Sequence, residues 1–284
     1  MSLVLKSPCK INLLLNVLGR REDDFHDLES IIQPLPLHDE LRIERTGKYV
    51  ELTCSDPRLS VGEDNLVHRA ASEFLKLAGF DGVRIHLQKN LPLAAGIGAG
   101  SSNAAMTLRG LNELFDHPLN MQDIQVMAAG LGSDVPFFLQ DGPALVTGRG
   151  DRVETLRPFS ILEGHGMLLV HPGFGVSTSW AYQRLAVMRE PFGTKGRLRT
   201  MVESLIEGRL EGFYNSLEAA VFSKYAVLPI IKGFFSANGA RAALMSGSGS
   251  TMFAITADRA SAEVLRAKYH DCFGQAGWSA TVAL

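Results

Sequence analysis

The chain has 284 residues, of which 46% are hydrophobic and 20% are charged, proportions that are typical of a globular protein. A chain of this length can bury a large core and suits one large domain or two ordinary ones. The formal net charge is −2, so no overall positive field favours nucleic acid or an anionic membrane as a partner. Composition therefore argues against both of these partner classes.

The cysteine content and the distribution of apolar residues bear on the cellular compartment. Cys9, Cys54 and Cys272 lie far apart, and an odd, sparse set of this kind predicts reduced thiols. No apolar run has the length of a membrane span, and residues 1–10 are too short and polar for a signal peptide. We therefore expect a cytoplasmic protein, without membrane attachment, that is a monomer or a weak homodimer.

Apolar runs and turn residues predict strands in the first quarter of the chain. These strands are expected at residues 3–5, 11–17, 40–44 and 50–54. Ser7 and Pro8 should break the first pair, and a turn over residues 46–48 should join the second pair. Asp64 is then the predicted N-cap of a helix that runs from Asn65 to about Leu77.

The next elements alternate between strands and helices. A half-buried strand is predicted at 83–87, because Val83, Ile85 and Leu87 alternate with polar residues. Further elements are predicted as a helix over about 104–115, a helix over 121–129, and strands at 144–147, 167–170 and 279–283. Glycines at 148 and 150 favour a domain boundary near residues 150–160.

The segment from Pro92 to Ala105 is the most informative part of the sequence. Gly96, Gly98 and Gly100 alternate before two serines, between a predicted strand and a predicted helix. Glycine lets the backbone approach a ligand closely, and a helix start offers unpaired N–H groups and a positive dipole end. The segment is therefore a candidate phosphate loop, although a tight turn before a small-residue helix would have the same composition.

The spacing of this segment excludes the two commonest phosphate loops. No lysine precedes Ser101, as a Walker A loop requires. Gly100 follows Gly98 by two residues, where a Rossmann fingerprint needs three.

Three other segments carry candidate functional residues, and each has a plain structural alternative. Lys10 precedes an apolar strand, where an exposed lysine is the commoner explanation. Asp134 opens an apolar turn before Pro136, where an ordinary helix N-cap would serve as well. The small-residue segment 245–255 also fits a β-bulge or a tight strand entry. The sequence contains no metal-ligand cluster, and we predict no metal site built from protein side chains alone.

Together these segments resemble the three signature motifs of the GHMP kinase superfamily, in the order that the family has them. The family motif Pro-x-x-x-Gly-Leu-Gly-Ser-Ser-Ala-Ala is similar to residues 92–105. Residues 8–13, 20–30 and 132–136 resemble the branch of the family that recognises a cytidine-linked substrate. Residues 64–70 are similar to that family's helix beside the adenine, and the resemblance extends from about residue 6 to 255.

The resemblance implies an α+β fold with two domains. Residues 1–155 would form an N-terminal domain like domain 2 of ribosomal protein S5, and residues 156–284 a ferredoxin-like C-terminal domain. The active site would lie in the cleft between the two domains.

The resemblance also implies a reaction. The γ-phosphoryl group of ATP, which brings Mg²⁺ (Mg2+) with it, would move to the 2-hydroxyl of cytidine diphosphate-linked methylerythritol. This is a step of the non-mevalonate isoprenoid pathway.

Residue roles follow from the matched motifs. Lys10 and Asp134 would be catalytic, the former as a cation beside the transferring phosphoryl group and the latter as the base. Asn12, Phe25 and His26 would bind the cytidine substrate. The implied ATP-binding residues are Asn65, Leu66, Pro92, Leu93, Ala94, Ala95, Gly96, Ile97, Gly98, Ala99, Gly100, Ser101 and Ser102. The implied phosphate-cleft residues of the second domain are Gly247, Ser248, Gly249 and Ser250.

The chain departs from the family pattern at several of these positions. Phe25 stands where tyrosine is usual, Asp24 where glycine is usual, and Ala99 where glycine is frequent. Ala99 would be strained if its φ were positive.

Two other functions fit the same motifs less well. A homoserine or mevalonate type of GHMP kinase would not need the Phe25-His26 pair. A catalytically silent binding protein on the same fold would need neither Lys10 nor Asp134.

Overall fold

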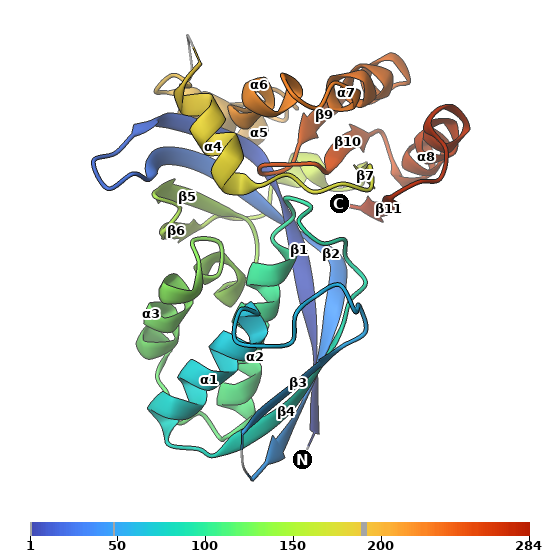
Figure 1. Ribbon diagram of the computed structural model, residues 1–284. Coiled ribbons are helices and arrows are strands. Elements are labelled where there is room, and N and C mark those ends of the chain that lie inside the picture. Colours follow the sequence, from blue (N-terminus) through green and yellow to red (C-terminus); the bar gives the residue numbers. More distant parts are fainter. Residues whose placement is uncertain (1, 48, 189–191) are drawn as a thin grey trace. The chain divides into compact units, whose positions relative to one another are not determined.

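The computed structural model describes residues 2–47, 49–188 and 192–284 (Figure 1). The chain forms two compact units, each built from three segments. Unit 1 contains residues 1–9, 36–91 and 98–141, and unit 2 contains residues 10–35, 92–97 and 142–284. The two units interleave along the chain and so do not test the predicted boundary. The domains 1–155 and 156–284 therefore stay a prediction.

Two long strands contribute residues to both units. These strands are β1 (Ser2–Arg20) and β2 (His26–Thr46), which are neighbours in one sheet. Residues 2–9 and 36–46 of these strands belong to unit 1, and residues 10–20 and 26–35 belong to unit 2.

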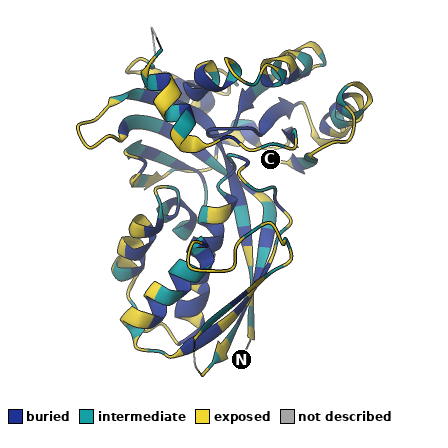
Figure 2. Cartoon of the chain, in the orientation of Figure 1, coloured by how far each residue is buried: buried dark blue, intermediate teal, exposed yellow. Residues whose placement is uncertain are grey.

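Unit 1 combines these strand segments with two more strands and a group of helices. Its further elements are β3 (Val50–Cys54), α1 (Leu66–Ala78), β4 (Gly82–Gln88), α2 (Ala99–Leu114), α3 (Met121–Leu131) and the 3-10 helix η1 (Pro136–Leu139). β4 pairs antiparallel with residues 40–46 of β2 and parallel with β3. The buried faces of α1 and α2 are dark in Figure 2, and their apolar residues close the core of the unit.

Unit 2 contains an antiparallel hairpin and a second sheet. Its elements after residue 141 are β5 (Ala144–Gly148), β6 (Arg152–Thr155), η2 (Ser160–Leu162), β7 (Gly166–His171), α4 (Thr178–Ala186), α5 (Arg197–Ile206), β8 (Tyr214–Asn215), α6 (Leu217–Phe222), α7 (Val227–Ala237), β9 (Ala242–Met245), β10 (Met252–Thr256), α8 (Arg259–Phe273) and β11 (Trp278–Ala283). β5 pairs with residues 28–32 of β2, and β8 pairs with Leu14 and Leu15 of β1.

The second sheet of unit 2 has the strand order β11-β7-β10-β9, with antiparallel neighbours. Helices follow β7 before the β9–β10 pair, and α8 precedes β11. This order, with its β-α-β-β-α-β sequence of elements, is the ferredoxin-like arrangement. The resemblance predicted it for the C-terminal part of the chain.

Several element predictions were accurate, and others were wrong. The strand at 83–87 is confirmed, with Val83, Ile85 and Leu87 buried and the intervening side chains exposed. The predicted break at Ser7 and Pro8 is wrong, because β1 continues through both residues. In the described chain β8 pairs with β1 only at Leu14 and Leu15. Pro8 therefore lies where β1 is an edge, and proline is tolerated there.

The strands predicted at residues 40–44 and 50–54 are both present, within β2 and as β3. The two strands are not paired with each other, because β4 lies between them in the sheet. Lys48, in the predicted turn, lies outside the described residues.

The start of α1 differs from the prediction, whereas the end of α3 agrees with it closely. Asn65, not Asp64, is the N-cap of α1, since its side-chain oxygen accepts from the N–H of Val67 at 2.8 Å. α3 was predicted to end near Gly130, and it ends at Leu131.

Candidate functional site

Lys10, Asn12 and Ser30 form a buried chain of hydrogen bonds in unit 2. Lys10 Nζ donates to Asn12 Oδ1 at 2.8 Å, and Asn12 Nδ2 donates to Ser30 Oγ at 2.8 Å. Ser30 Oγ donates to the carbonyl of Leu14 at 2.6 Å. Lys10 is only 3% exposed, which excludes the alternative of a surface lysine. Lys10 and Asn12 share one face of β1, because strand side chains alternate, and this places both predicted residues together.

The glycine loop begins in unit 2, where residues 92–97 pack against the backbone of residues 246–251. The N–H of Lys10 donates to the carbonyl of Ile97 at 3.0 Å, which joins this loop to β1. Ser246 Oγ donates to the carbonyl of Gly96 at 3.0 Å. The N–H of Thr251 donates to the carbonyl of Ala95 at 3.2 Å. The two predicted small-residue segments are therefore one structural feature.

Close backbone approach explains the glycines at this junction. Gly96 has φ +76°, and a Cβ there would lie 2.3 Å from the carbonyl oxygen of Ser246. A Cβ on Gly247, which has φ +55°, would lie 2.7 Å from the carbonyl oxygen of Gly96. No L side chain fits either position without movement of the backbone.

The serines of the second segment make hydrogen bonds inside unit 2. Ser248 Oγ and Thr178 Oγ1 share a hydrogen bond at 2.8 Å, and Ser250 Oγ donates to the carbonyl of Phe174. Asn215 supports the same loop from β8, because its Nδ2 donates to the carbonyls of Met245 and Gly247, each at 2.8 Å. These contacts fix the shape of the loop that was predicted to line a phosphate cleft.

The second part of the glycine loop begins helix α2 in unit 1. Gly98 precedes the helix with φ +69°, and no side chain caps it. The first N–H groups of a helix have no intrahelical partner, so this end can bind an anion. The first turn contains no acidic residue that would compete with one. Ala99 is helical and not strained, whereas Ala94 has a positive φ, 50°.

The two serines of this turn differ in exposure. Ser101 is half-buried, and Ser102 is fully buried with its hydroxyl hydrogen-bonded to that of Ser7 at 2.8 Å. The two serines are therefore not equivalent, and Ser101 has the more accessible hydroxyl.

The predicted adenine residues lie at the start of α1, also in unit 1. Both polar ends of the Asn65 side chain are engaged, Oδ1 by Val67 and Nδ2 by the carbonyl of Ser60 at 2.6 Å. Leu66 is half-buried, and its Cδ1 lies 3.9 Å from the position of a Cβ on Gly100. The structure thus places Leu66 beside the first turn of α2.

Asp134 lies between α3 and η1 in unit 1 and is half-buried. The capping alternative is wrong, because the residue before η1 is Val135 and no side chain caps that helix. The N–H of Val135 donates to the carbonyl of Gly132 at 3.1 Å, which forms a turn around Asp134. This turn therefore sets the backbone at Asp134.

Aromatic rings surround His26 in unit 2. The His26 ring lies 5.1 Å from the centroid of Tyr182 and 6.1 Å from that of Phe192. His26 is 9% exposed, and its Nε2 has no hydrogen-bond partner among the described groups. Burial lowers the pKa of His26, and the positive charge of Arg20 lowers it further. A neutral imidazole with a vacant nitrogen can pair with a base edge.

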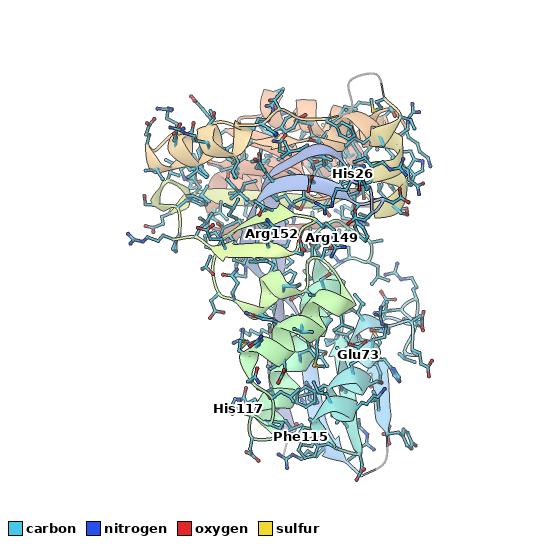
Figure 3. The ribbon with its side chains drawn as sticks, turned by 90° about the vertical axis from the view of Figure 1, so that its left-hand side faces the viewer. His26, Glu73, Phe115, His117, Arg149 and Arg152 are labelled. Carbon is cyan, nitrogen blue, oxygen red and sulfur yellow. The ribbon has the colours of Figure 1, made fainter. Side chains whose placement is uncertain are left out.

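Phe25 lies in the loop that joins β1 to β2, and it is 51% exposed. The guanidinium carbon of Arg149, from the β5–β6 turn, lies 5.0 Å from the centroid of the Phe25 ring. Figure 3 shows Arg149 in the turn between β5 and β6 and His26 at the start of β2. Asp24, where the family usually has glycine, has φ +64°, a conformation that aspartate tolerates better than most residues.

Sequence reasoning did not find Ser30, Tyr182 or Phe192. Ser30 lies at the end of the family-like segment 20–30, but nothing in the sequence indicated that its hydroxyl accepts from the amide of Asn12. Tyr182 and Phe192 are more than 150 positions from His26 in the sequence, and only the fold brings the three rings together.

The described residues contain neither a metal site built from side chains nor a membrane-spanning helix. Among the described residues, no group of three or more His, Cys, Asp or Glu side chains could hold a metal ion. Across the same parts of the chain, no helix is long and apolar enough to cross a membrane.

Two family models match the chain. The model for the GHMP kinases N terminal domain matches residues 65–142, which include α1, the start of α2 and Asp134. The model for the GHMP kinases C terminal matches residues 201–275, which include the 246–251 loop.

Known proteins agree with these matches. The chain is 40% identical over 252 residues to the 4-diphosphocytidyl-2-C-methyl-D-erythritol kinase of Syntrophus aciditrophicus (strain SB), a match that covers 88% of each chain. A crystal structure of 4-(cytidine 5'-diphospho)-2C-methyl-D-erythritol kinase is 34% identical, with a TM-score of 0.81, and covers 99% of this chain and 100% of that one.

A homoserine kinase from Cytophaga hutchinsonii is similar in fold alone. It is 19% identical, with a TM-score of 0.73, over 100% of this chain and 95% of that one. The predicted fold class, an α+β fold of GHMP kinase type, is confirmed by these matches. The chain belongs to the GHMP kinase family.

Proposed function

We propose that this protein is an ATP-dependent kinase that phosphorylates the 2-hydroxyl of 4-diphosphocytidyl-2-C-methyl-D-erythritol. One observation carries the proposal: relatives named for this activity are 33–40% identical over most of the chain. The homoserine and mevalonate kinases of the family share 12–19% identity with it. This likeness supports a common fold and gives no support for a common substrate. The reaction belongs to the non-mevalonate isoprenoid pathway.

The phosphates of ATP would bind at the start of α2. Backbone N–H groups of residues 98–101 and the hydroxyl of Ser101 would hold them, supported by the loop at 92–97. Ser102 would act from inside the unit, because its hydroxyl is bound to Ser7. Leu66 would supply an apolar surface for the nucleotide, and Asn65 would fix the start of the helix that carries it.

Lys10 would neutralise negative charge on the transferring phosphoryl group. Its ammonium is buried and oriented by Asn12, so little reorganisation is needed when charge develops. Phosphoryl transfer depends mainly on positioning and electrostatics, and a fixed cation serves both.

Asp134 would accept the proton of the 2-hydroxyl as its oxygen attacks the γ-phosphorus. The new bond joins that oxygen to phosphorus, the bond from phosphorus to the β,γ-bridging oxygen breaks, and ADP leaves. The turn from Gly132 to Val135 would hold the carboxylate for this task.

The cytidine end of the substrate would bind among the rings of unit 2. Phe25 offers a half-exposed face for stacking, and a shift of the buried His26 ring would bring its unpartnered Nε2 to the edge of the base. Tyr182 and Phe192 would hold the imidazole in place. Gly247, Ser248, Gly249 and Ser250 would support the phosphate loop through backbone packing.

Mg²⁺ would arrive with ATP. Magnesium in kinases is bound largely by phosphates and water, with one or two carboxylates, and it would supply charge neutralisation on the β- and γ-phosphates. We further infer a cytoplasmic protein, since the three cysteines form no disulfide in the described residues.

The test is a coupled assay for ADP with a panel of alcohols. The panel contains the cytidine diphosphate-linked methylerythritol, homoserine and mevalonate. We expect turnover with the cytidine compound alone, and a phosphate on its 2-hydroxyl by ³¹P NMR. Preferential turnover of homoserine or mevalonate would refute the proposal, and binding of the cytidine compound without turnover would favour a silent binding protein.

A further inference from the structure

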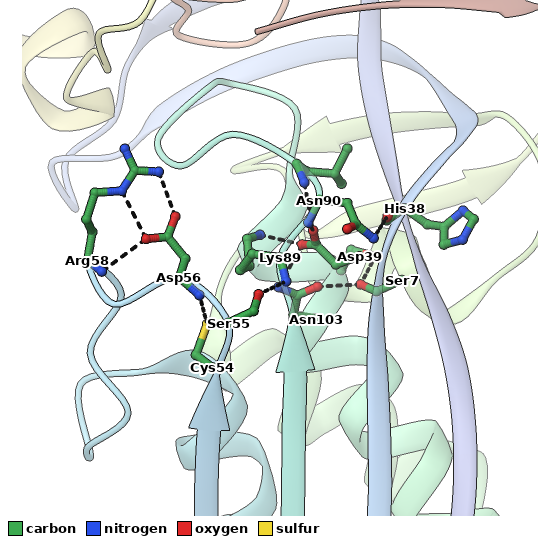
Figure 4. A network of polar contacts seen from close by, with 12 residues as sticks. Ser7, His38, Asp39, Cys54, Ser55, Asp56, Arg58, Lys89, Asn90 and Asn103 are labelled. Atoms are coloured by element: carbon green, nitrogen blue, oxygen red, sulfur yellow. Dashed lines mark hydrogen bonds and ion pairs between the residues drawn. The ribbon is translucent and has the colours of Figure 1, made fainter. Parts of the chain in front are cut away.

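A buried network of polar side chains in unit 1 includes Asn103 of α2 (Figure 4). Its centre is Asp39 of β2, which is fully buried. Asp39 Oδ1 accepts from the N–H groups of Asn90 at 2.8 Å and Leu91 at 2.9 Å, just after β4. Asp39 Oδ2 contacts the ammonium of Lys89. A buried carboxylate is therefore compensated by a cation and by two backbone donors.

The same carboxylate reaches α2. Asn103 Nδ2 donates to Asp39 Oδ2 at 3.1 Å, and Asn103 is 2% exposed. Asn103 Oδ1 accepts from Ser7 Oγ of β1 at 2.6 Å, and Ser7 is also hydrogen-bonded to Ser102. Side chains of β1 and β2 thus meet at two consecutive residues of α2, Ser102 and Asn103.

These contacts restrict the helix in a way that apolar packing does not. Hydrogen bonds are directional and lose strength steeply with angle, so two of them to one amide fix both the rotation and the height of the first turn. Bonds to a charged group are also stronger than neutral ones. A phosphate site needs its donors within about 0.5 Å of their working positions.

We propose that Asp39 is a positioning residue for ATP, which acts through Asn103 on the phosphate-binding turn of α2. The inference rests on the proposed function in placing the phosphates at this turn. Asp39 and Asn103 touch no substrate; they set where the N–H groups of residues 98–101 point.

The decisive variant is Asn103→Ala, because it removes the link to α2 and leaves the Asp39–Lys89 pair in place. We expect the KM for ATP to rise about tenfold, the loss expected for a hydrogen bond to a charged group. The KM for the cytidine substrate and kcat should change by less than about threefold. A control, Ile85→Val, removes a methyl group from the same core without touching the network. It should lower the thermal unfolding midpoint and leave the KM for ATP unchanged.

A second measurement separates positioning from general damage. Asp39→Asn and Asn103→Asp each disturb the amide–carboxylate pair, the second by placing two carboxylates together. In the double variant the amide and the carboxylate exchange places, and the hydrogen bond can form again. We expect each single variant to raise the KM for ATP and the double variant to recover at least half of the loss, measured as log KM.

The results of these variants distinguish the positioning role of Asp39 from the assignment of the phosphate site to α2. An unchanged KM for ATP in Asn103→Ala, or a rise matched by Ile85→Val, would overturn the positioning role. A double variant no better than the single ones would overturn it as well. A bulky substitution at Ser101 that leaves ATP affinity unchanged would instead refute the phosphate assignment at α2, whatever Asn103→Ala does.

Discussion

Lys10 donates a hydrogen bond to Asn12, two positions along the same strand, and both side chains are 3% exposed. A buried ammonium is costly unless it meets compensating groups or an anion. The amide of Asn12 donates in turn to Ser30. Ser30 therefore affects the orientation of Lys10 through Asn12, although it does not contact the ammonium in this chain of hydrogen bonds.

The first prediction concerns this ammonium. Lys10→Met should lower kcat on the order of 10²-fold, the usual loss when one preorganised electrostatic group is removed. Lys6→Met is the matched control, because Lys6 is exposed on the same strand. Steady-state kinetics at saturating ATP measures both variants. Equal activity of the two variants would contradict the role of Lys10.

The second prediction concerns the base. Asp134→Asn should reduce kcat on the order of 10²-fold or more, because the amide cannot accept the hydroxyl proton. Affinity for ATP, measured by calorimetry, should stay within a factor of about two. Asp141→Asn, at a side chain 95% exposed, should retain normal turnover. Turnover of Asp134→Asn close to that control would remove Asp134 as the base.

The third prediction concerns the cytidine site. Phe25→Ala should raise the KM for the cytidine substrate about tenfold or more, since stacking of a base on an aromatic ring contributes about 1–3 kcal/mol. The KM for ATP should not change. Tyr49→Ala removes an aromatic ring of similar exposure from unit 1 and serves as the control. Parallel rises in both KM values would show that Phe25 is not at a cytidine site.

The fourth prediction concerns the junction of the two small-residue loops. Gly96→Ala should lower the free energy of unfolding by about 2–4 kcal/mol, from the positive φ and from overpacking against the backbone at Ser246 and Gly249. Gly233→Ala, in an exposed interior position of α7 with open space around it, should raise that free energy by about 0.5–1 kcal/mol. Urea denaturation measures both. A loss below about 1 kcal/mol for Gly96→Ala would disprove the close approach.

The fifth prediction concerns pH. Burial lowers the pKa of His171, and a backbone hydrogen bond at Phe174 opposes that effect in part. The unfolded chain therefore binds a proton, near the ordinary pKa of about 6.5, before the folded chain does. The free energy of unfolding should fall as the pH decreases through 6.5, and His26 should contribute in the same direction. Urea denaturation between about pH 7.5 and 5.5 measures this slope.

A variant at His171 tests the origin of that slope. His171→Gln should make the dependence on pH shallower, because one buried titrating group is gone. The same substitution at exposed His86 is expected to leave the slope in place. Identical slopes in the native protein and in His171→Gln would exclude His171 as a source.

The fold was predictable where the signal is local. Strand 83–87 was found because alternation reports one buried face. Most of β2 was missed, because Pro34 and Pro36 are typical of loops. β2 pairs with β5 over residues 28–32 and with β4 over residues 40–46, so both prolines fall between those partners. Whether a strand tolerates proline depends on which strands pair with it at that position, and the local sequence does not indicate this pairing.

The site was predictable only as far as its motifs extend. Lys10, Asn12 and His26 were predicted through a family resemblance, which assigned no role to their partners Ser30, Tyr182 and Phe192. The N-cap of α1 shows that the exact first residue of a helix is also hard to predict from sequence. Asp64 and Asn65 both have capping side chains, and only the backbone conformation decides that Asn65 accepts from Val67.

The shared strands β1 and β2 have a consequence for synthesis of the protein. Leu15 and Val17, near the N-terminus, lie in one apolar core with Leu265 and Tyr269 of α8. The ribosome releases the first pair some 250 residues before the second. Unit 2 therefore cannot complete its core until α8 has been synthesised. Its first strand must be kept from other apolar partners throughout, so a truncated or stalled chain should depend on chaperones more than a full-length one.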